Sequence, residues 1–325
     1  MKTRISFIIP AFNEEHNIAQ TIAAIHRYGG DPADYEILVI DHGSGDRTEA
    51  VAQDLGATVY RRPGGTIASL RNFGAGRATG EIIVFLDADV DLTAEWNKHF
   101  PEIERELKRN SQLVTGSHCS APPDGTWIER FWFRNFATQR HASHIGSGHL
   151  IIRRDFFLEL NGFDSDLRTG EDYEFSRRAL SSGAKIVNDL RLEVIHRGFP
   201  KTVGGLIRRE AWHGQGDLVS VRAFVQSKVA VASAIFLLLN VVTVMSLVLQ
   251  IGLWKVPAIS LAILLGMLVA SSLHRFRHCA LRVVAVNALI FYFYYTGRSI
   301  ALFRRSSWWR DKGTVKSADS GRRSA

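Results

Sequence analysis

Three aspartates, Asp87, Asp89 and Asp91, stand at alternate positions directly after the apolar run 81–86. Carboxylates at such close spacing repel one another unless a cation lies between them. Mg²⁺ and Mn²⁺ prefer oxygen ligands and are commonly held by one or two carboxylates together with the phosphates of a substrate. The cluster is therefore typical of a site for a divalent ion that accompanies a phosphorylated ligand and stabilises charge on a departing phosphate.

The same aspartates have a structural interpretation. Asp87 and Asp89 are common turn residues, and one DxD motif is weak evidence by itself. Asp91 or Thr93 is expected to cap the helix that begins at residue 94. We therefore leave Asp91 out of the predicted ligand set.

The position of the cluster follows from the elements around it. Short apolar runs at 5–9, 36–40 and 81–86 alternate with helical patterns at 14–28 and 66–78. This alternation predicts βαβ units and a mostly parallel sheet flanked by helices, an α/β fold. Ligands bind beyond the carboxyl ends of the strands in such a sheet. One rim should therefore gather the three segments that follow these strands, PAFNEE, DHGSGDRT and DADVD.

The C-terminal third has a different composition. Residues 229–254 contain no charged side chain, and a second uncharged run at 256–273 follows Lys255. At about 1.5 Å per residue, each run can cross a hydrocarbon core of ~30 Å. The alternative is a buried helical hairpin in a soluble protein, but soluble helices rarely lack a charged face over such a length.

A third apolar run at 283–303 is interrupted by Arg298 and contains an aromatic cluster at 291–295, which is typical of a membrane interface. The preceding segment 274–282 is basic and is expected in the cytoplasm, which places the N-terminal domain there as well. A spanning third run would put the C-terminus outside, whereas an interfacial run would keep it inside. The sequence leaves both open.

Charge is distributed unevenly along the chain. Forty basic and 32 acidic residues give a formal net charge of +8, and residues 304–325 alone contribute seven basic and two acidic side chains. Because this tail follows membrane segments, anionic lipid is the expected partner and nucleic acid is not. The predicted organisation is a catalytic domain at 1–222, a membrane region with two or three transmembrane helices at 223–303, and a basic tail at 304–325.

The chain resembles the family 2 glycosyltransferases, which have the GT-A nucleotide-sugar-binding fold. The resemblance covers most of the first 180 residues, and its segments occur in the order of the family: SFIIPAFNEE (6–15), ILVIDHGSGDRT (37–48), RNFGAGRATGEIIVFLDADV (71–90) and GSGHLIIRRDFFLELNGFDSDLRTGEDYEFSRRA (146–179).

The resemblance implies a role for each matching residue. Asp87 and Asp89 would hold Mg²⁺ or Mn²⁺, with His196 as a further candidate, although a single histidine is more often structural. In the GED segment, Asp172 would be the general base and Glu171 its neighbour. A UDP-, GDP- or dTDP-linked sugar would be bound by Pro10, Phe12, Asn13, Glu14, Asp41, Arg71, Asp87 and Asp89.

Two of these groups have structural alternatives. Asn13 could cap a helix that starts near Glu14. Glu171 and Asp172 could simply favour the dipole in the first turn of the helix that follows.

Two departures from the family pattern limit what it implies. The segment RREAWHG (208–214) would place Arg208 and Trp212 on the acceptor side, but Ala211 stands where processive polysaccharide synthases have arginine. His42 stands where many members have a second aspartate, which leaves the nucleotide base open.

The implied reaction is an inverting displacement at the anomeric carbon, with a lipid-linked or otherwise membrane-associated acceptor. A sugar hydroxyl needs a general base, whereas an anionic polyprenyl phosphate does not, so the GED segment favours a hydroxyl and leaves polyprenyl phosphate as the alternative. A non-catalytic sugar-nucleotide sensor would be expected to lack Asp87, Asp89 or Asp172, and all three are present. The expected location is the cell membrane (inner or plasma membrane), as a multi-pass protein with a cytoplasmic catalytic domain. The sequence does not identify the donor sugar, the acceptor or the oligomeric state.

Overall fold

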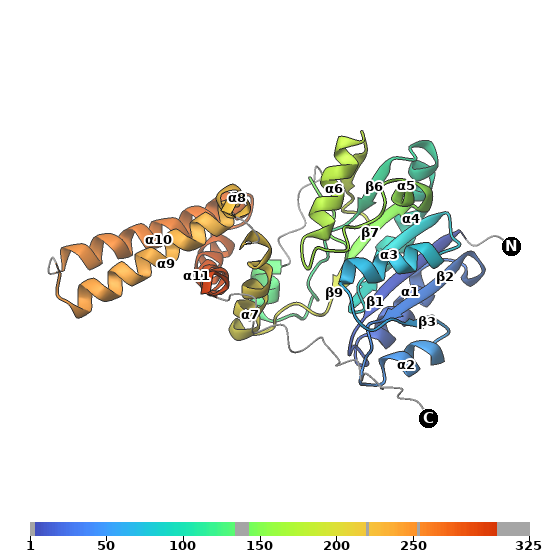
Figure 1. Cartoon of the computed structure of the whole chain (residues 1–325), viewed down its shortest axis with the longest axis horizontal. Helices are drawn as coiled ribbons and strands as arrows, with labels where there is room; N and C mark the ends of the chain where they lie inside the picture. Colours follow the sequence, from blue (N-terminus) through green and yellow to red (C-terminus); the bar gives the residue numbers. More distant parts are fainter. Residues whose placement is uncertain (1–3, 134–142, 219–220, 252–253, 304–325) are drawn as a thin grey trace, which may run out of the picture.

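The computed structural model describes residues 4–133, 143–218, 221–251 and 254–303. A seven-stranded sheet with helices on both faces forms one end of the molecule, and the C-terminal helices extend from it (Figure 1). Its strands lie in the order β3 (Thr58–Arg61), β2 (Tyr35–Asp41), β1 (Ile5–Ala11), β4 (Ile82–Leu86), β7 (His149–Arg153), β6 (Leu113–Gly116) and β8 (Lys185–Asn188).

The predicted α/β class is confirmed, and the mostly parallel sheet contains one antiparallel strand. Strands β3, β2, β1 and β4 are parallel, as the strand–helix alternation predicts. Strand β7 runs antiparallel to both of its neighbours, β4 and β6, so the sheet is mixed. A separate antiparallel pair joins β5 (Val90–Leu92) to β9 (Val194–His196).

The side chains of β1 alternate between two cores. Phe7 and Ile9 belong to the core that contains residues of α1 (Ile18–Tyr28), α2 (Thr48–Asp54) and α4 (Ala94–Arg109). Ile8 belongs to the opposite core, with residues of α3 (Ile67–Arg77), α5 (Arg154–Glu159) and α6 (Glu171–Ser181). Strands that are covered on both faces read as unbroken apolar runs, which explains the pattern in the sequence.

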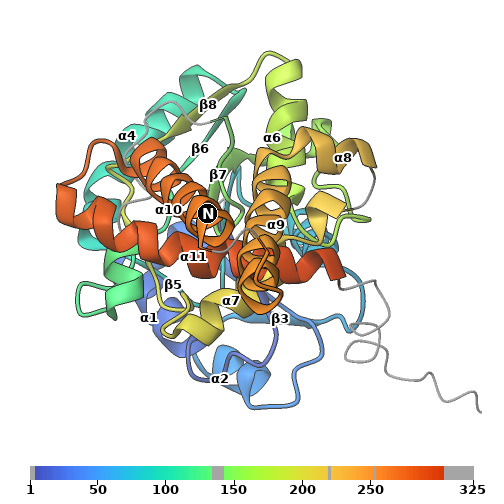
Figure 2. The same ribbon diagram turned by 90° about the vertical axis from the view of Figure 1, so that its left-hand side faces the viewer.

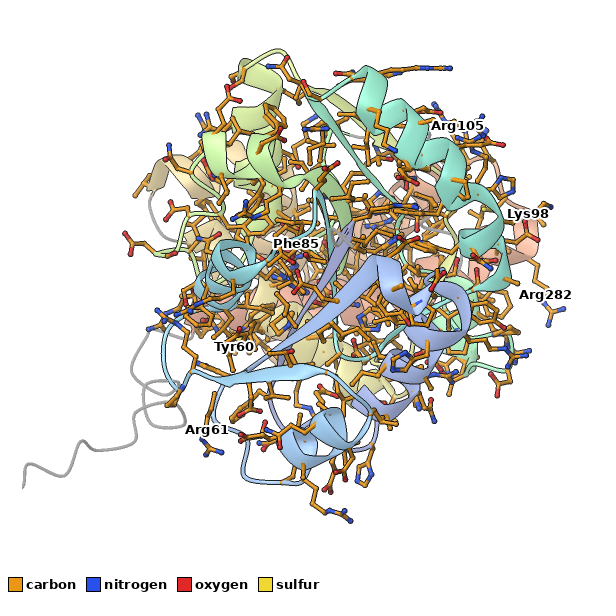
Figure 3. The ribbon with its side chains drawn as sticks, turned by 90° about the vertical axis from the view of Figure 1, so that its right-hand side faces the viewer. Tyr60, Arg61, Phe85, Lys98, Arg105 and Arg282 are labelled. Atoms are coloured by element: carbon orange, nitrogen blue, oxygen red, sulfur yellow. The ribbon has the colours of Figure 1, made fainter. Side chains whose placement is uncertain are left out.

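Figure 3 shows the same layering from the side chains. Phe85 of β4 lies in the middle of the molecule, and Lys98 and Arg105 lie on the outer side of α4. Helix α4 therefore buries one face against the sheet and leaves its charged face to solvent.

The start of α1 differs from the prediction. The helix begins at Ile18 and not near Glu14, because Asn13 adopts a left-handed conformation (φ 57°) and residues 15–17 form a turn. Asn13 therefore does not cap the helix; its Oδ1 accepts a hydrogen bond from the Gly45 amide at 2.9 Å. At α4, by contrast, the N-cap is Thr93, which is one of the two residues expected in that role, Asp91 and Thr93.

The C-terminal helices form a second layer of structure beyond the sheet. Helices α9 (Lys228–Val248) and α10 (Lys255–Phe276) pair as a projecting hairpin (Figure 1), and they are the two helices of the described residues that are long and apolar enough to cross a membrane. Short helical turns η1 (Pro32–Asp34), η2 (Glu129–Phe133) and η4 (Gly216–Leu218) and helix α8 (Val221–Gln226) complete the described chain. The domain boundaries at 222 and 303 stay a prediction, and the basic tail lies outside the described residues.

The third apolar run forms α11 (Leu281–Phe303), which has a different orientation. It crosses the base of the α9–α10 hairpin (Figures 1 and 2) and packs against α7 (Val203–His213). Gly297 permits this approach, since a Cβ there would lie 2.7 Å from the Ile207 carbonyl oxygen. A cluster rich in aromatic residues, with members from η2, α7, α9, α10 and α11, fills the junction between the hairpin and the sheet domain.

Candidate active site

A cavity of about 260 Å³ opens at the carboxyl ends of β1 and β4. Its position is the one that the sequence predicts for the rim, because the parallel strands end at the same edge. Among its lining residues are Pro10, Phe12, Glu14, Asp87, Asp89 and His196. The structure thus brings six of the predicted residues together from three separate segments.

Asp87, Asp89 and His196 form a compact group at the floor of this cavity. One ligand atom of each lies within 4.8 Å of the others. The pairing of β5 with β9 is responsible, since it sets His196 opposite Val90 and so beside Asp89. Two carboxylates and one imidazole suit a divalent cation such as Mn²⁺.

The electrostatics of the group also fit a cation. Burial, followed by the charges of Asp87 and Glu14, raises the pKa of Asp89 to about 7. Burial lowers the pKa of His196 to about 4, so the ring is neutral at neutral pH, and its Nδ1 accepts a hydrogen bond from the Gly198 amide at 3.0 Å. A cation bound here would relieve the repulsion among the carboxylates.

Two glycines shape this floor. A Cβ on Gly148 would lie 2.7 Å from Oδ2 of Asp87, and a Cβ on Gly198 would overlap Oδ2 of Asp89. Any side chain at either position would displace a carboxylate of the group. Sequence reasoning missed both glycines, because only the folded backbone brings them to the carboxylates.

Arg71 joins the group to the GED segment. Its guanidinium is almost fully buried, with Nη2 2.5 Å from Asp87 and Nη1 2.9 Å from Glu171. Ser147 Oγ donates a further hydrogen bond of 2.9 Å to Glu171. The buried charges are therefore paired, which is the condition for holding them in a protein interior.

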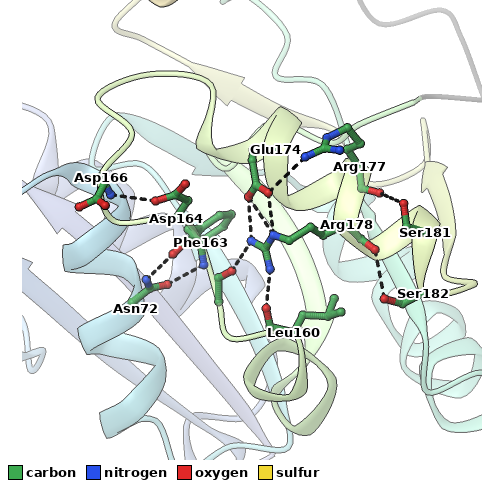
Figure 4. A network of polar contacts seen from close by, with 11 residues as sticks. Asn72, Leu160, Phe163, Asp164, Asp166, Glu174, Arg177, Arg178, Ser181 and Ser182 are labelled. Carbon is green, nitrogen blue, oxygen red and sulfur yellow. Dashed lines mark hydrogen bonds and ion pairs between the residues drawn. The ribbon is translucent and has the colours of Figure 1, made fainter. Parts of the chain in front are cut away.

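A second network fixes the elements that carry Arg71 and Glu171 (Figure 4). Arg178 of α6 pairs with Glu174 and donates to the carbonyls of Leu160 and Gly162. Asn72, next to Arg71, donates to the Phe163 carbonyl at 2.7 Å. The loop between α5 and α6 is thus hydrogen-bonded to both α3 and α6. These bonds fix the start of α6 relative to α3.

A larger cavity of about 520 Å³ adjoins the first and shares Ile67, Asp87 and His196 with it. Asp172, in the first turn of α6, lines this second cavity together with Glu171 and Trp212. The cavity reaches from the GED segment to residues of α7, α10 and α11. Two connected spaces that meet at Asp87 can hold a donor and an acceptor on opposite sides of a reacting atom.

Asp41 and Asn13 do not line either cavity. Asp41 is buried, and its Oδ1 accepts hydrogen bonds of 2.8 Å from the amides of Gly43 and Ser44. The Asp41 carboxylate thus closes its own turn, and its contact with the nucleotide stays a prediction. His42 lines the smaller cavity instead, with its ring edge-on to Phe12 at 5.6 Å.

Arg208 is another predicted residue that lies elsewhere. It is exposed and lines neither cavity, whereas Arg209 lines the larger one. Ala211, at the position of the missing motif arginine, is buried in the helix packing. Because successive helical residues point about 100° apart, the side chain next in sequence faces a different surface. The helical pattern of α7 is the signal that could have identified Arg209.

The sheet, the rim of carboxylates and the two joined cavities define a GT-A glycosyltransferase. The Glycosyl transferase family 2 profile matches residues 6–160. An uncharacterized glycosyltransferase of Mycobacterium tuberculosis is 30% identical over 191 residues, which cover 56% of this chain and 82% of the relative. The chain belongs to glycosyltransferase family 2, and it is an enzyme of that class.

Other relatives agree with this assignment. The glycosyltransferase AglE of Haloferax volcanii is 27% identical over 230 residues, 66% of this chain and 73% of the relative. A dolichol-phosphate mannosyltransferase of Pyrococcus furiosus is 32% identical over 167 residues, 49% of this chain and 45% of the relative. The solved mannosyltransferase PcManGT of Pyrobaculum calidifontis, in complex with GDP-Man and Mn²⁺, has a TM-score of 0.57 at 16% identity and covers 93% of this chain and 87% of its own, which shows the shared fold.

Proposed function

We propose that this enzyme transfers a sugar, with inversion and with the help of a divalent metal ion, from a nucleotide sugar to a lipid-linked acceptor at a membrane. The observation that carries the proposal is the shared wall of the two cavities. Asp87 and His196 face both the smaller cavity at the strand ends and the larger one that reaches the base of the apolar hairpin. A donor and a membrane-bound acceptor can therefore meet at one point.

The residues of the two cavities have separate roles in the proposed reaction. Phe12 and Glu14 border the space for the nucleotide sugar, and Arg71 holds Asp87 in place. The acceptor oxygen attacks the anomeric carbon from the larger cavity, the bond to the diphosphate oxygen breaks, and a hydroxyl proton passes to Asp172. A metal ion held by Asp87, Asp89 and His196 would offset the charge of the nucleoside diphosphate.

A second acceptor class is supported by the relatives. The Pyrococcus furiosus relative is named a dolichol-phosphate mannosyltransferase. A relative from an Enterobacter strain, 34% identical over 107 residues, is named an undecaprenyl-phosphate 4-deoxy-4-formamido-L-arabinose transferase. Polyprenyl phosphate itself is therefore the alternative acceptor. Its anionic oxygen needs no general base, which separates it from a sugar hydroxyl.

The proposed membrane topology follows from α10 and α11. Arg275, in the basic segment at the end of α10, lines the same cavity as Asp172, so this segment lies on the catalytic side. Basic segments favour the cytoplasm. We place α11 in the interface, because it crosses the base of the hairpin. Both chain ends then lie on the cytoplasmic side of a two-span cell-membrane protein.

The test is donor turnover by the purified full chain with UDP-, GDP- and dTDP-sugars and Mn²⁺, with and without EDTA. We expect turnover of one donor, lost with EDTA and reduced about 10²-fold or more in Asp89→Asn. Asp54→Asn, an exposed carboxylate on α2, is the control and should retain full activity. Metal-dependent donor binding that never gives turnover with lipid acceptors would instead indicate a sensor. Turnover insensitive to both EDTA and Asp89→Asn would refute the metal-dependent mechanism.

A further inference from the structure

The larger cavity contains arginines that the proposed transfer does not use. Arg209, Arg275 and Arg298 line its end nearest the hairpin, and they come from α7, α10 and α11. Arg298 is neutralised by Glu210 and Asp217, each at 3.0 Å. Its charge is therefore satisfied within the protein.

Arg209 is in a different situation. Its guanidinium carbon lies 4.8 Å from the ring centre of Phe133 and 5.5 Å from that of Phe199. Its Nη1 atom is buried and has no hydrogen-bond partner among the described residues, and no ion pair recorded for them includes Arg209. Burial lowers the pKa of Arg209, because the charged form is removed from water. A buried, unsatisfied donor that faces a cavity points to an anionic ligand.

The location separates this ligand from the donor diphosphate. Arg209 lines the larger cavity and not the smaller one, where the proposed metal ligands meet the nucleotide residues. Phe199 stacks on His196 at 4.3 Å and on Phe133 at 4.1 Å, and Arg209 lies nearer to the Phe133 ring. The anion would thus lie in the larger cavity, on the acceptor side.

The residues near Arg209 indicate where the anion would lie relative to the membrane. Arg275 stands in the last turn of α10, with its guanidinium 5.2 Å from the ring centre of Trp132. The end of a membrane-spanning helix lies at the depth of lipid head groups. A ligand that reaches Arg209 and Arg275 from the membrane would therefore present its phosphate here and leave its chain among the lipids.

We infer that Arg209 and Arg275 form a subsite for the phosphate or diphosphate group of the lipid-linked acceptor. The inference rests on the proposed function and adds the group by which the acceptor is held. Processive polysaccharide synthases have an arginine at the position of Ala211. In this chain Arg209 would supply the cation instead, from a different face of α7. Arginine suits the role, since its fork donates two parallel hydrogen bonds to a phosphate.

The test measures binding to the full chain in nanodiscs of neutral phosphatidylcholine, in the presence of EDTA. Farnesyl phosphate, farnesol and inorganic phosphate are titrated by calorimetry. We expect farnesyl phosphate to bind, with affinity reduced roughly tenfold or more in Arg209→Gln and about threefold in Arg209→Lys. Arg282→Gln removes an exposed arginine that points away from the molecule (Figure 3), and should change the affinity less than about twofold.

Binding of the nucleoside diphosphate with Mn²⁺ is measured on the same variants. Unchanged nucleotide affinity shows that Arg209→Gln is folded; if that variant does not fold, Arg209→Lys carries the comparison. Equal affinity of the foldable variants and the wild type for farnesyl phosphate would overturn the inference. So would a loss of nucleotide affinity alone, or inorganic phosphate binding as tightly as farnesyl phosphate with the same dependence on Arg209. Loss of metal dependence in donor turnover would refute the proposed function and leave this binding result untouched.

Discussion

Arg71 and Glu171 form a buried ion pair at 2.9 Å across a separation of 100 residues. The pair joins the helix after β3 to the first turn of α6. Through the second contact of Arg71, with Asp87, the carboxylate rim and the GED segment become one rigid unit. The donor and acceptor sides are therefore positioned relative to each other by one guanidinium.

Removal of Arg71 should destabilise the protein strongly. In Arg71→Met, the buried carboxylate of Glu171 and the half-buried carboxylate of Asp87 lose their cation, at a cost of about 3–5 kcal/mol. This corresponds to a fall in melting temperature on the order of 10 °C. Arg61→Met removes an exposed pair with Glu49 and should lower it by about 2 °C at most. Similar melting temperatures for the two variants would contradict a structural role of the Arg71 bridge.

Gly198 should be intolerant of a side chain. In Gly198→Ala, the new methyl group would overlap the Asp89 carboxylate, so Mn²⁺ affinity and donor turnover should both fall roughly tenfold or more. Gly204→Ala is the matched control, because its Cβ would meet no atom within 4 Å. Titration of Mn²⁺ with each variant distinguishes the two, and undiminished affinity in Gly198→Ala would exclude Asp89 as a ligand.

Asp172→Asn should discriminate between the two acceptor classes. If the acceptor is a sugar hydroxyl, loss of the base should lower kcat by about 10²–10⁴-fold. If the acceptor is polyprenyl phosphate, the same change should have little effect, because no proton is removed. The measurement is kcat with a lipid-linked sugar and with polyprenyl phosphate, with Mn²⁺-dependent donor binding as the check on folding.

His149 should make stability depend on pH. Burial lowers its pKa to about 3, and the indole of Trp96, a donor only, fixes Nε2 of His149 as an acceptor at 3.0 Å. Between pH 6.5 and 3 the unfolded chain binds a proton that the folded chain does not, so this contribution to stability is lost as pH falls. The melting temperature of the wild type should decrease more steeply from pH 7 to 4 than that of His149→Gln. Equal slopes would show that His149 is protonated in the folded protein.

The sequence by itself determined the strands, the rim and the hairpin. Each depends on local information: apolar runs for β1, β2 and β4, and two long uncharged stretches for α9 and α10. The carboxyl ends of parallel strands must share one edge, so the meeting of Glu14, Asp87 and Asp89 was predictable.

Only the tertiary structure determined which of two residues adjacent in the sequence faces a cavity. Arg209 lines the larger cavity instead of Arg208, and His42 lines the smaller one instead of Asp41. Adjacent residues on a helix or a turn point in different directions, and only packing selects the direction that faces the ligand. The same holds for the orientation of α11 relative to the sheet domain, which its contact with α7 sets and its apolar composition does not.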